Sequence, residues 1–296
     1  MVEDFLAAMA ASSRRRVEAA KAQLAETELV ASLTDLPPAP ALQLSSQGFD
    51  VIAEMKLRSP ALGQLRSKMD DSADQRIRAY VQGGAAAISV LTEPDRFDGS
   101  LDHLRAASAL RVVQQSADGR ARRIPTMRKD FLVDPYQVLE ARAAGAGGVL
   151  LIVRMLHDPT LQRLCETALK QRLFVLIETF DLADIERANR LIEQLRSNDT
   201  ALLIGVNSRD LVSLQVVPDR LEKLVSQLPD SVPRVAESGV ITPSDAARMA
   251  SAGYDLALIG GALMQATDPE AHLAAMLRAA RDAAVQRRAS LRERPS

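Results

Sequence analysis

Eight short apolar segments recur along the 296-residue sequence, and their number and spacing limit the folds open to the chain. Most are unbroken runs of Val, Ile, Leu and Ala, which is typical of strands buried on both faces of a parallel sheet. The predicted strands are 51–56 (VIAEMK), 86–92 (AAISVLT), 125–129 (PTMRK), 148–153 (GVLLIV), 173–178 (LFVLIE), 202–207 (LLIGVN), 233–237 (PRVAE) and 255–260 (DLALIG).

Helical patterns separate these segments. In DPTLQRLCETALKQR, Asp158 is placed to cap a helix, and in ITPSDAARMASAG the cap is Thr242 and the stop is Gly253. In DLADIERANRLIEQL, an apolar stripe begins at Leu182. Eight alternating strands and helices predict the α/β class and a single (β/α)8 TIM barrel. An open dinucleotide-binding sheet would carry G-x-G-x-x-G after its first strand, where this chain has LRSPALG.

The ends of the chain lie outside this alternation. Residues 2–33 read as one extra amphipathic helix, which we expect to cover one mouth of the barrel. The predicted organisation is an N-terminal helical extension (1–35), a linker (36–48) that contains LPPAPAL, and the barrel (49–296). The basic end QRRASLRERPS is expected to be solvated.

Composition excludes several classes of protein. The net charge is −1, whereas nucleic-acid binders usually carry a basic excess. A single cysteine, Cys165, rules out an internal disulfide and fits a reducing compartment, and three scattered histidines give no metal-ligand spacing. The N-terminus lacks the charge order of a secretory signal, and no apolar run is long enough to span a bilayer. We therefore expect a cytoplasmic protein without metal, membrane or nucleic acid.

Ionisable and amide side chains gather where the predicted strands end. They are Glu54, Lys56, Thr92, Glu93, Arg128, Lys129, Asp130, Arg154, Glu178, Asn207, Glu237 and Ser238. Active sites of (β/α)8 barrels lie at this end of the strands. Because residues two apart in a strand share a face, Glu54 and Lys56 should point together into the barrel mouth. A purely structural role for the whole set is disfavoured, since several buried charges are costly and rarely add stability.

Glycines after the last two predicted strands indicate what binds. Gly239 follows the seventh strand, and Gly260 and Gly261 follow the eighth, each before a predicted helix. The loops after strands seven and eight are the recurrent phosphate site of these barrels, because glycine lets backbone N–H groups approach an oxyanion. The sequence therefore predicts a substrate with a phosphate at one end and reactive chemistry at the other.

Five segments, read together, resemble indole-3-glycerol phosphate synthase, the ring-closing enzyme of tryptophan biosynthesis. They are IAEMKLRSP, ISVLTEPDRFDGSLDHL, RKDFLVDPYQVLEARAAGAGGVLLIV, IGVNSRDL and VAESGVITPSD. The resemblance implies a decarboxylating lyase. It would convert 1-(2-carboxyphenylamino)-1-deoxyribulose 5-phosphate to indole-3-glycerol phosphate, with loss of CO2 and water and without a cofactor. It leaves the oligomeric state open between a monomer and a weak homo-oligomer.

The resemblance also implies roles for individual residues. Lys129 would be the general acid at the substrate ketone, Lys56 would contact the substrate and assist dehydration, and Glu178 would transfer protons. Glu54 and Glu237 would position and stabilise, and Asn207 would hydrogen-bond the substrate. Phosphate and substrate contacts fall on Ser59, Ser238, Gly239, Gly260 and Gly261. The apolar slot for the anthranilate ring falls on Phe97, Phe131, Leu150, Leu211 and Leu258.

Some positions depart from the family pattern. Ser59-Pro60-Ala61-Leu62-Gly63 stands where S-P-S-K-G is usual, Thr179-Phe180 follows Glu178, and Gly261 stands where a serine or larger residue is frequent. These departures leave room for a paralogue in specialised indole metabolism.

Two further readings compete. Phosphoribosylanthranilate isomerase is a related barrel that uses a cysteine and an aspartate, but Cys165 lies on the apolar stripe of a predicted helix. A non-catalytic barrel that only binds a phosphorylated metabolite would not need so many charges at the rim.

Overall fold

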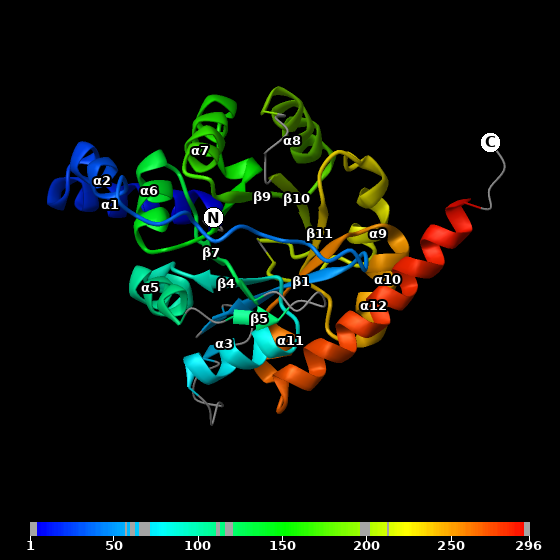
Figure 1. Cartoon of the computed structure of the whole chain (residues 1–296). Coiled ribbons are helices and arrows are strands. Elements are labelled where there is room, and N and C mark those ends of the chain that lie inside the picture. Colours follow the sequence, from blue (N-terminus) through cyan, green and yellow to red (C-terminus); the bar gives the residue numbers. More distant parts are fainter. Residues whose placement is uncertain are drawn as a thin grey trace.

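The computed structural model describes residues 5–56, 58–59, 63–64, 72–110, 113–115, 121–195, 202–211 and 213–292. Eight parallel strands form a closed barrel in the order β1-β12-β11-β10-β9-β8-β7-β4, and β4 pairs with β1 to complete it (Figure 1). The predicted (β/α)8 barrel is confirmed. The strands are β1 (Asp50–Met55), β4 (Ala87–Leu91), β7 (Thr126–Lys129), β8 (Gly148–Ile152), β9 (Phe174–Thr179), β10 (Leu202–Asn207), β11 (Arg234–Glu237) and β12 (Leu256–Ile259).

Helices surround the barrel and alternate with its strands (Figure 1). They are α3 (Ala73–Gln82), α4 (Pro94–Phe97), α5 (Leu101–Ala109), α6 (Pro135–Ala143), α7 (Asp158–Lys170), α8 (Leu182–Leu195), α9 (Arg220–Leu224), α10 (Pro243–Ala252), α11 (Gly261–Gln265) and α12 (Pro269–Arg292), with 3-10 turns η2 (Val153–Met155) and η3 (Val225–Gln227). Two small antiparallel sheets pair β2 (Arg58–Ser59) with β3 (Gly63–Gln64), and β5 (Val113–Gln115) with β6 (Ala121–Arg123). None of the helices in the described ranges is long and apolar enough to cross a membrane.

The helix ends test the capping predictions. Thr242 accepts a hydrogen bond from the Asp245 N–H at the start of α10, and Gly253 ends that helix with φ 116°, as predicted. The prediction for Asp158 was wrong: His157 precedes the helix, and the Asp158 carboxylate instead accepts from Arg187. The predicted stripe of α8 holds at Ile185, but Leu182 is 51% exposed because the stripe starts one turn later.

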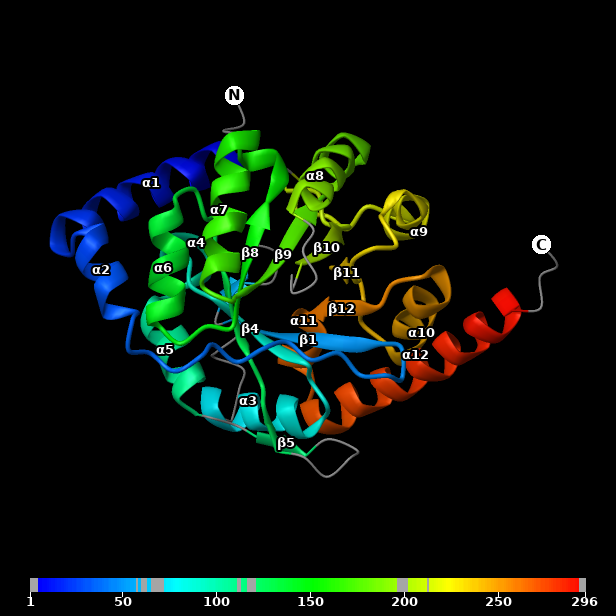
Figure 2. The same cartoon turned by 45° about the horizontal axis from the view of Figure 1, so that its top comes forward.

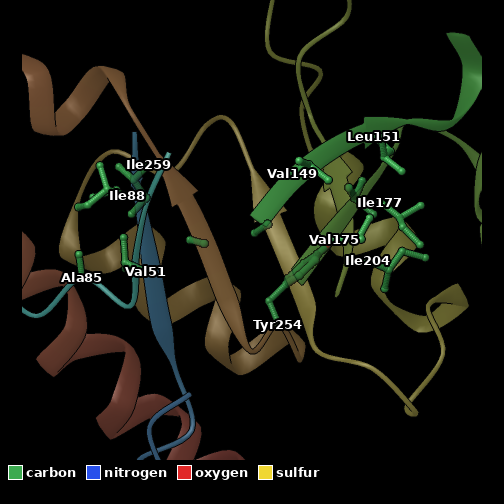
Figure 3. Packing of buried hydrophobic residues seen from close by; sticks show 14 of the residues in the cluster. Val51, Ala85, Ile88, Val149, Leu151, Val175, Ile177, Ile204, Tyr254 and Ile259 are labelled. Carbon is green, nitrogen blue, oxygen red and sulfur yellow. The ribbon is translucent and has the colours of Figure 1, made fainter. Parts of the chain in front are cut away.

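Side chains alternate strictly between two apolar cores. On the outer face of the strands, residues such as Val51, Ile88 and Val175 pack under the helices (Figure 3). The inner face holds a separate cluster: Ile52, Ala87, Met127, Leu150, Phe174, Leu176, Leu203, Val235, Leu256 and Leu258. Side chains alternate between the two faces of a strand. The residue two positions after an inner apolar residue, toward the carboxyl end, therefore also points inward. That rule places Glu54, Lys129, Glu178 and Glu237 inside the barrel, above the inner cluster.

The N-terminal extension forms two helices, α1 (Phe5–Gln23) and α2 (Glu26–Ser32), so the prediction of one helix over 2–33 was wrong. The chain bends at Ala25, which is extended, and Leu29 and Leu33 of this region then pack on Tyr136 and Leu139. Helix α1 lies beside α6 at one end of the barrel (Figure 2). Its Ser13 hydroxyl donates to the Phe131 carbonyl at 2.5 Å. The extension thus reaches the end of the barrel where the strand carboxyl ends lie.

The C-terminal helix α12 packs along α10 and α3 on the other side of the molecule (Figure 1). Arg281 of this helix donates to the Phe49 carbonyl and pairs with Asp50 at 3.0 Å, which ties α12 to the start of β1. The basic end expected to be solvated continues this helix to Arg292, and residues 288–290 are exposed.

Candidate active site

A cavity of about 300 Å³ opens at the carboxyl ends of the barrel strands. It brings together all the residues to which the family resemblance gives roles, except Ser59. Those lining it are Glu54, Lys56, Phe97, Lys129, Phe131, Leu150, Glu178, Asn207, Leu211, Glu237, Ser238, Gly239, Leu258, Gly260 and Gly261. Ser59 pairs with Gly63 in the β2-β3 sheet, but its side chain and residues 60–62 lie outside the described part of the chain.

One ion pair lies at the end of β1. The Lys56 ammonium donates to Glu54 Oε1 at 2.5 Å, and the Glu54 side chain is only 5% exposed. Burial disfavours the carboxylate, but the charges of Lys56 and Lys129 outweigh it and lower the pKa of Glu54. Glu54 is therefore a buried anion that orients Lys56 toward the cavity.

Lys129 stands at the end of β7 among carboxylates from three other strands. Its ammonium lies 3.6 Å from Glu178 Oε2. Burial disfavours the ammonium, but Glu178, Glu54 and Glu237 together raise the pKa of Lys129 above its ordinary range. Lys129 is thus held as a cation at every pH where the protein would work, and it can donate hydrogen bonds but not act as a resting-state base.

Glu237 is the least compensated of these carboxyl groups. It is 1% exposed, and neither of its oxygens finds a hydrogen-bond donor among the described residues. Burial and the neighbouring Glu178 charge raise the pKa of Glu237 well above its ordinary value. The surroundings of Glu237 therefore favour its protonated form more than those of an ordinary glutamate do.

Backbone geometry shapes the opposite side of the cavity. Ser238 and Gly239 both have positive φ, 66° and 78°, so the chain turns sharply after β11. Gly260 follows β12, and a Cβ there would lie 2.2 Å from Glu54 Oε1 and 2.9 Å from Lys56 Nζ. Glycine at 260 is therefore needed to leave room for the Glu54–Lys56 pair, a requirement that the sequence pattern did not reveal.

An apolar wall closes the remaining side. The rings of Phe97 and Phe131 have centroids 6.3 Å apart, and Phe5 of α1 meets Phe131 edge-on at 5.8 Å. Leu150, Leu211 and Leu258 continue this wall. A flat ring would fit against such a surface, because aromatic side chains stack in offset or edge-on arrangements at these distances.

Four polar residues predicted at the rim do not line the cavity. Thr92 bonds to Asp130 at 2.8 Å, and Glu93 caps α4 by accepting from the Asp95 and Arg96 N–H groups. Arg128 occupies the outward-facing position beside Lys129 and bonds to Asp130, Glu140 and the Gln137 carbonyl. Arg154 falls in the turn η2 and pairs with Asp181 and Asp184. These groups hold loops and helices in place.

The sequence reasoning missed several residues of the cavity lining, most of them apolar, and two of them carry an aromatic ring or a charge. Phe5 belongs to the N-terminal extension, and nothing in its local sequence marks a site. Arg209 follows Asn207 by two positions, and its backbone N–H donates to the Asn207 side chain at 2.9 Å. Its guanidinium donates to the Leu214 carbonyl at 2.7 Å. The alternation of faces, continued for two residues past the end of β10, could have identified Arg209 as a residue that faces the cavity.

The described residues contain no group of three His, Cys, Asp or Glu side chains placed to hold a metal ion. Cys165, the residue needed by the isomerase reading, is buried in α7 under the helix layer and is absent from the cavity lining.

We predict that Cys165 resists thiol reagents in the folded protein. Burial raises the pKa of its thiol to about 12, so the reactive thiolate is scarce and shielded. Ellman's reagent at pH 8 should release almost no chromophore until denaturant is added, and then one equivalent, since the chain has one cysteine. Rapid stoichiometric reaction of the folded protein would contradict the burial.

Comparisons with known proteins agree with this geometry. The family model described as "Indole-3-glycerol phosphate synthase" matches residues 6–276. A protein of that name from a Nocardioides species is 42% identical over 263 residues, covering 86% of this chain and 93% of its own. One from a Mycobacterium species (strain KMS) is 40% identical over 272 residues, covering 89% and 92%.

Solved structures support the fold alone. The 3-hexulose-6-phosphate synthase of Salmonella typhimurium matches with a TM-score of 0.57 at 15% identity, covering 80% of this chain and 99% of its own. Thiamine phosphate pyrophosphorylase of Pyrococcus furiosus matches with a TM-score of 0.54 at 16% identity, covering 80% and 97%. The family model spans nearly the whole chain and the relatives align over most of theirs, so the chain belongs to the indole-3-glycerol phosphate synthase family.

Proposed function

We propose that the cavity closes the indole ring of 1-(2-carboxyphenylamino)-1-deoxyribulose 5-phosphate, releasing CO2 and water. Membership of the family supports the activity. One observation supports the assignment to this cavity. Five charged residues, from four different strands and the segment after β1, line one opening: Lys129, Lys56, Glu54, Glu178 and Glu237. A barrel that only binds a metabolite has no use for so many charged groups, because burying them is costly.

In the proposed first step, a ring carbon of the substrate attacks the ketone carbon. The ketone oxygen becomes an alkoxide, and Lys129 donates its proton there. The neighbouring carboxylates keep Lys129 charged, so its proton is available when the alkoxide forms. The bond from the ring carbon to its carboxylate then breaks, CO2 leaves, and the electron pair restores the aromatic ring.

In the proposed second step, the new hydroxyl leaves as water and the adjacent carbon loses a proton. Glu178 accepts that proton, and Lys56, oriented by Glu54 at 2.5 Å, assists the departing hydroxyl. Asn207 hydrogen-bonds the substrate, and Glu237 adjusts the electrostatics of Glu178. No cofactor is needed, since each step moves only protons and electron pairs of the substrate.

Two anchors fold the substrate so that its reacting carbons meet. Ser59, Ser238, Gly239, Gly260 and Gly261 are proposed to bind the phosphate. The wall formed by Phe97, Phe131, Leu150, Leu211 and Leu258 is proposed to hold the anthranilate ring. Arg209, the cation of the cavity that lies beside Asn207, is placed to meet an anionic group of the substrate.

The wider setting is also a proposal. We place the enzyme in the cytoplasm, acting on a small phosphorylated substrate as a monomer or a weak homo-oligomer, with one barrel domain (49–296) behind the N-terminal extension. The single cysteine fits a reducing compartment.

The test of the activity is to incubate the purified protein with the ribulose phosphate and follow indole fluorescence. We expect product to accumulate, with CO2 released in equal amount. The analogue in which the ketone is reduced to an alcohol is the matched control, because it keeps both anchors but cannot be attacked. Binding of both compounds without product from either would support a barrel that only binds.

A further inference from the structure

Gly205 is a glycine in the interior of a strand, where neither a turn nor a positive φ requires one. It lies in the middle of β10, on the inward face between Leu203 and Asn207, and its φ is outside the left-handed region. Glycine weakens a strand interior, and where it occurs it often marks a site that another group approaches closely. A Cβ at this position would lie 2.1 Å from Glu237 Oε1 and 3.1 Å from Leu176 Cδ1. The space of the missing side chain is thus filled by the Glu237 carboxyl.

The strand register shows what this gap connects. Gly205 pairs with Glu178 of β9 on one side and with Val235 of β11 on the other. Glu237 pairs with Asn207, so its carboxyl leans back by one inward position to lie over Gly205, beside the strand that carries Glu178. With any other residue at 205, its side chain would separate the Glu178 carboxyl on β9 from the Glu237 carboxyl on β11.

The hydrogen bonding of the two carboxyl groups is incomplete if both are ionised. Glu178 and Glu237 are 2% and 1% exposed. Oε2 of Glu178 and both oxygens of Glu237 accept no hydrogen bond from the described residues, although Lys129 lies 3.6 Å from Glu178. Two carboxylates cannot donate to each other, whereas one proton between them supplies the missing donor and removes the repulsion.

We propose that Gly205 is a positioning residue, which lets Glu237 reach Glu178 so that the two carboxyl groups share one proton next to Lys129. The charges of the site support this. With one proton on the pair, Lys56 and Lys129 are balanced by Glu54 and by a single negative charge on the pair, and Arg209 remains to meet the anionic substrate. Burial and the Glu178 charge, which raise the pKa of Glu237, agree with the proton being held there.

The catalytic consequence rests on the proposed function. Glu237 carries the proton of the pair, so Glu178 stays a carboxylate that can accept the carbon-bound proton during dehydration. At alkaline pH the pair loses its proton and two adjacent anions repel, so turnover should fall. The charged or titratable groups that influence Glu237 from the surrounding elements are Glu178 on β9, Lys129 on β7, Glu54 on β1 and Tyr254 before β12. The pKa of Lys129 and of Tyr254 is raised, so neither accounts for a limb that begins closer to neutrality.

The first experiment compares the pH profiles of Gly205→Ala and Glu237→Gln with that of the wild type. In Glu237→Gln an amide donates permanently to Glu178, so we expect turnover within about tenfold of the wild type at neutral pH and no alkaline limb. In Gly205→Ala the methyl group displaces the Glu237 carboxyl, so we expect at least a tenfold lower kcat at neutral pH and a displaced limb. Gly148→Ala is the steric control, because its Cβ would lie 2.4 Å from the Phe174 ring, away from the carboxyl groups. It should alter stability but not the pH profile.

The second experiment needs no turnover. Infrared spectra at neutral pH should show the carbonyl stretch of one protonated carboxyl group in the wild type, absent from Glu237→Gln and shifted in Gly205→Ala. A spectrum without a Glu237-dependent carboxyl band, or an alkaline limb retained by Glu237→Gln, would overturn the shared proton. If the wild type makes no product yet shows the band, the proposed function fails and the pair stands. If product forms but the band is absent, the proposed function stands and the shared proton is contradicted.

Discussion

Lys129→Ala should lower turnover by at least about a hundredfold, the scale of a lost general acid, while the protein stays folded. The ammonium is the cation that meets Glu178 at 3.6 Å, and Glu54 and Glu237 also help to hold it charged. Without it, the alkoxide formed on ring closure has neither a proton donor nor a counter-charge, so kcat should fall more than substrate affinity. Indole fluorescence under saturating substrate measures the loss, and circular dichroism checks the fold.

Lys223→Ala is the matched control for this variant. The Lys223 side chain is 72% exposed, and within the described part of the chain its ammonium pairs with Asp219, at 3.9 Å. Lys223→Ala removes a lysine side chain from the surface of the protein, so it should leave turnover unchanged. If Lys129→Ala turned over substrate as fast as Lys223→Ala, Lys129 could not be the acid of the ring-closing step.

The strands and their inward residues could be predicted from the sequence because two simple periods govern them. Unbroken apolar runs locate buried parallel strands, and the period of two then places Glu54 and Lys56 on one face. The same rule separates Arg128 from Lys129, although the two are adjacent in the sequence. Applied more strictly, it would have removed Arg128 from the predicted rim.

Other features depend on contacts between distant segments, which local patterns do not encode. The bend at Ala25 has no glycine or proline to mark it, and packing of Leu29 and Leu33 on α6 accompanies it. Arg154 lies past the end of β8 in a 3-10 turn, where the strand period no longer applies. The need for glycine at 205 and 260 appears only when the Glu237 and Glu54 carboxyl groups are seen in the space that a Cβ would take.

Asp130→Asn should destabilise the protein by about 3–5 kcal/mol, the cost of leaving buried charges without their partner. The Asp130 carboxylate is fully buried and accepts from Arg128, Thr92 and the Phe131 N–H, and Arg16 of α1 bonds both of its oxygens at 2.8 and 2.9 Å. An asparagine keeps the shape but removes one of the two carboxylates that pair with Arg128, which is 2% exposed, and leaves Glu140 as its remaining counter-charge. Urea unfolding followed by circular dichroism measures the change.

The pH dependence of this loss has a definite sign. Burial disfavours the carboxylate, but Arg128 and Arg16 outweigh it and hold the pKa of Asp130 well below its ordinary value. A lowered folded-state pKa adds stability above the unfolded value of about 3.9, and that stability is lost as the pH falls through the folded value. The gap between wild type and Asp130→Asn should thus be constant from pH 6 to 8, on the order of the full effect, and shrink in acid.

Asp102→Asn separates this buried network from ordinary surface pairing. Asp102 meets Arg105 at 2.6 Å, but its side chain is 83% exposed, so its loss should cost less than about 1 kcal/mol. Equal effects of the two variants would mean that the Asp130 network adds no more than a surface pair. A large loss confined to Asp130→Asn would show that the buried Asp130 network, which joins Arg16 of α1 to the end of β7, stabilises the fold. Phe5 and Phe131 would then be expected to separate in that variant, because Ser13 of the same helix bonds the Phe131 carbonyl.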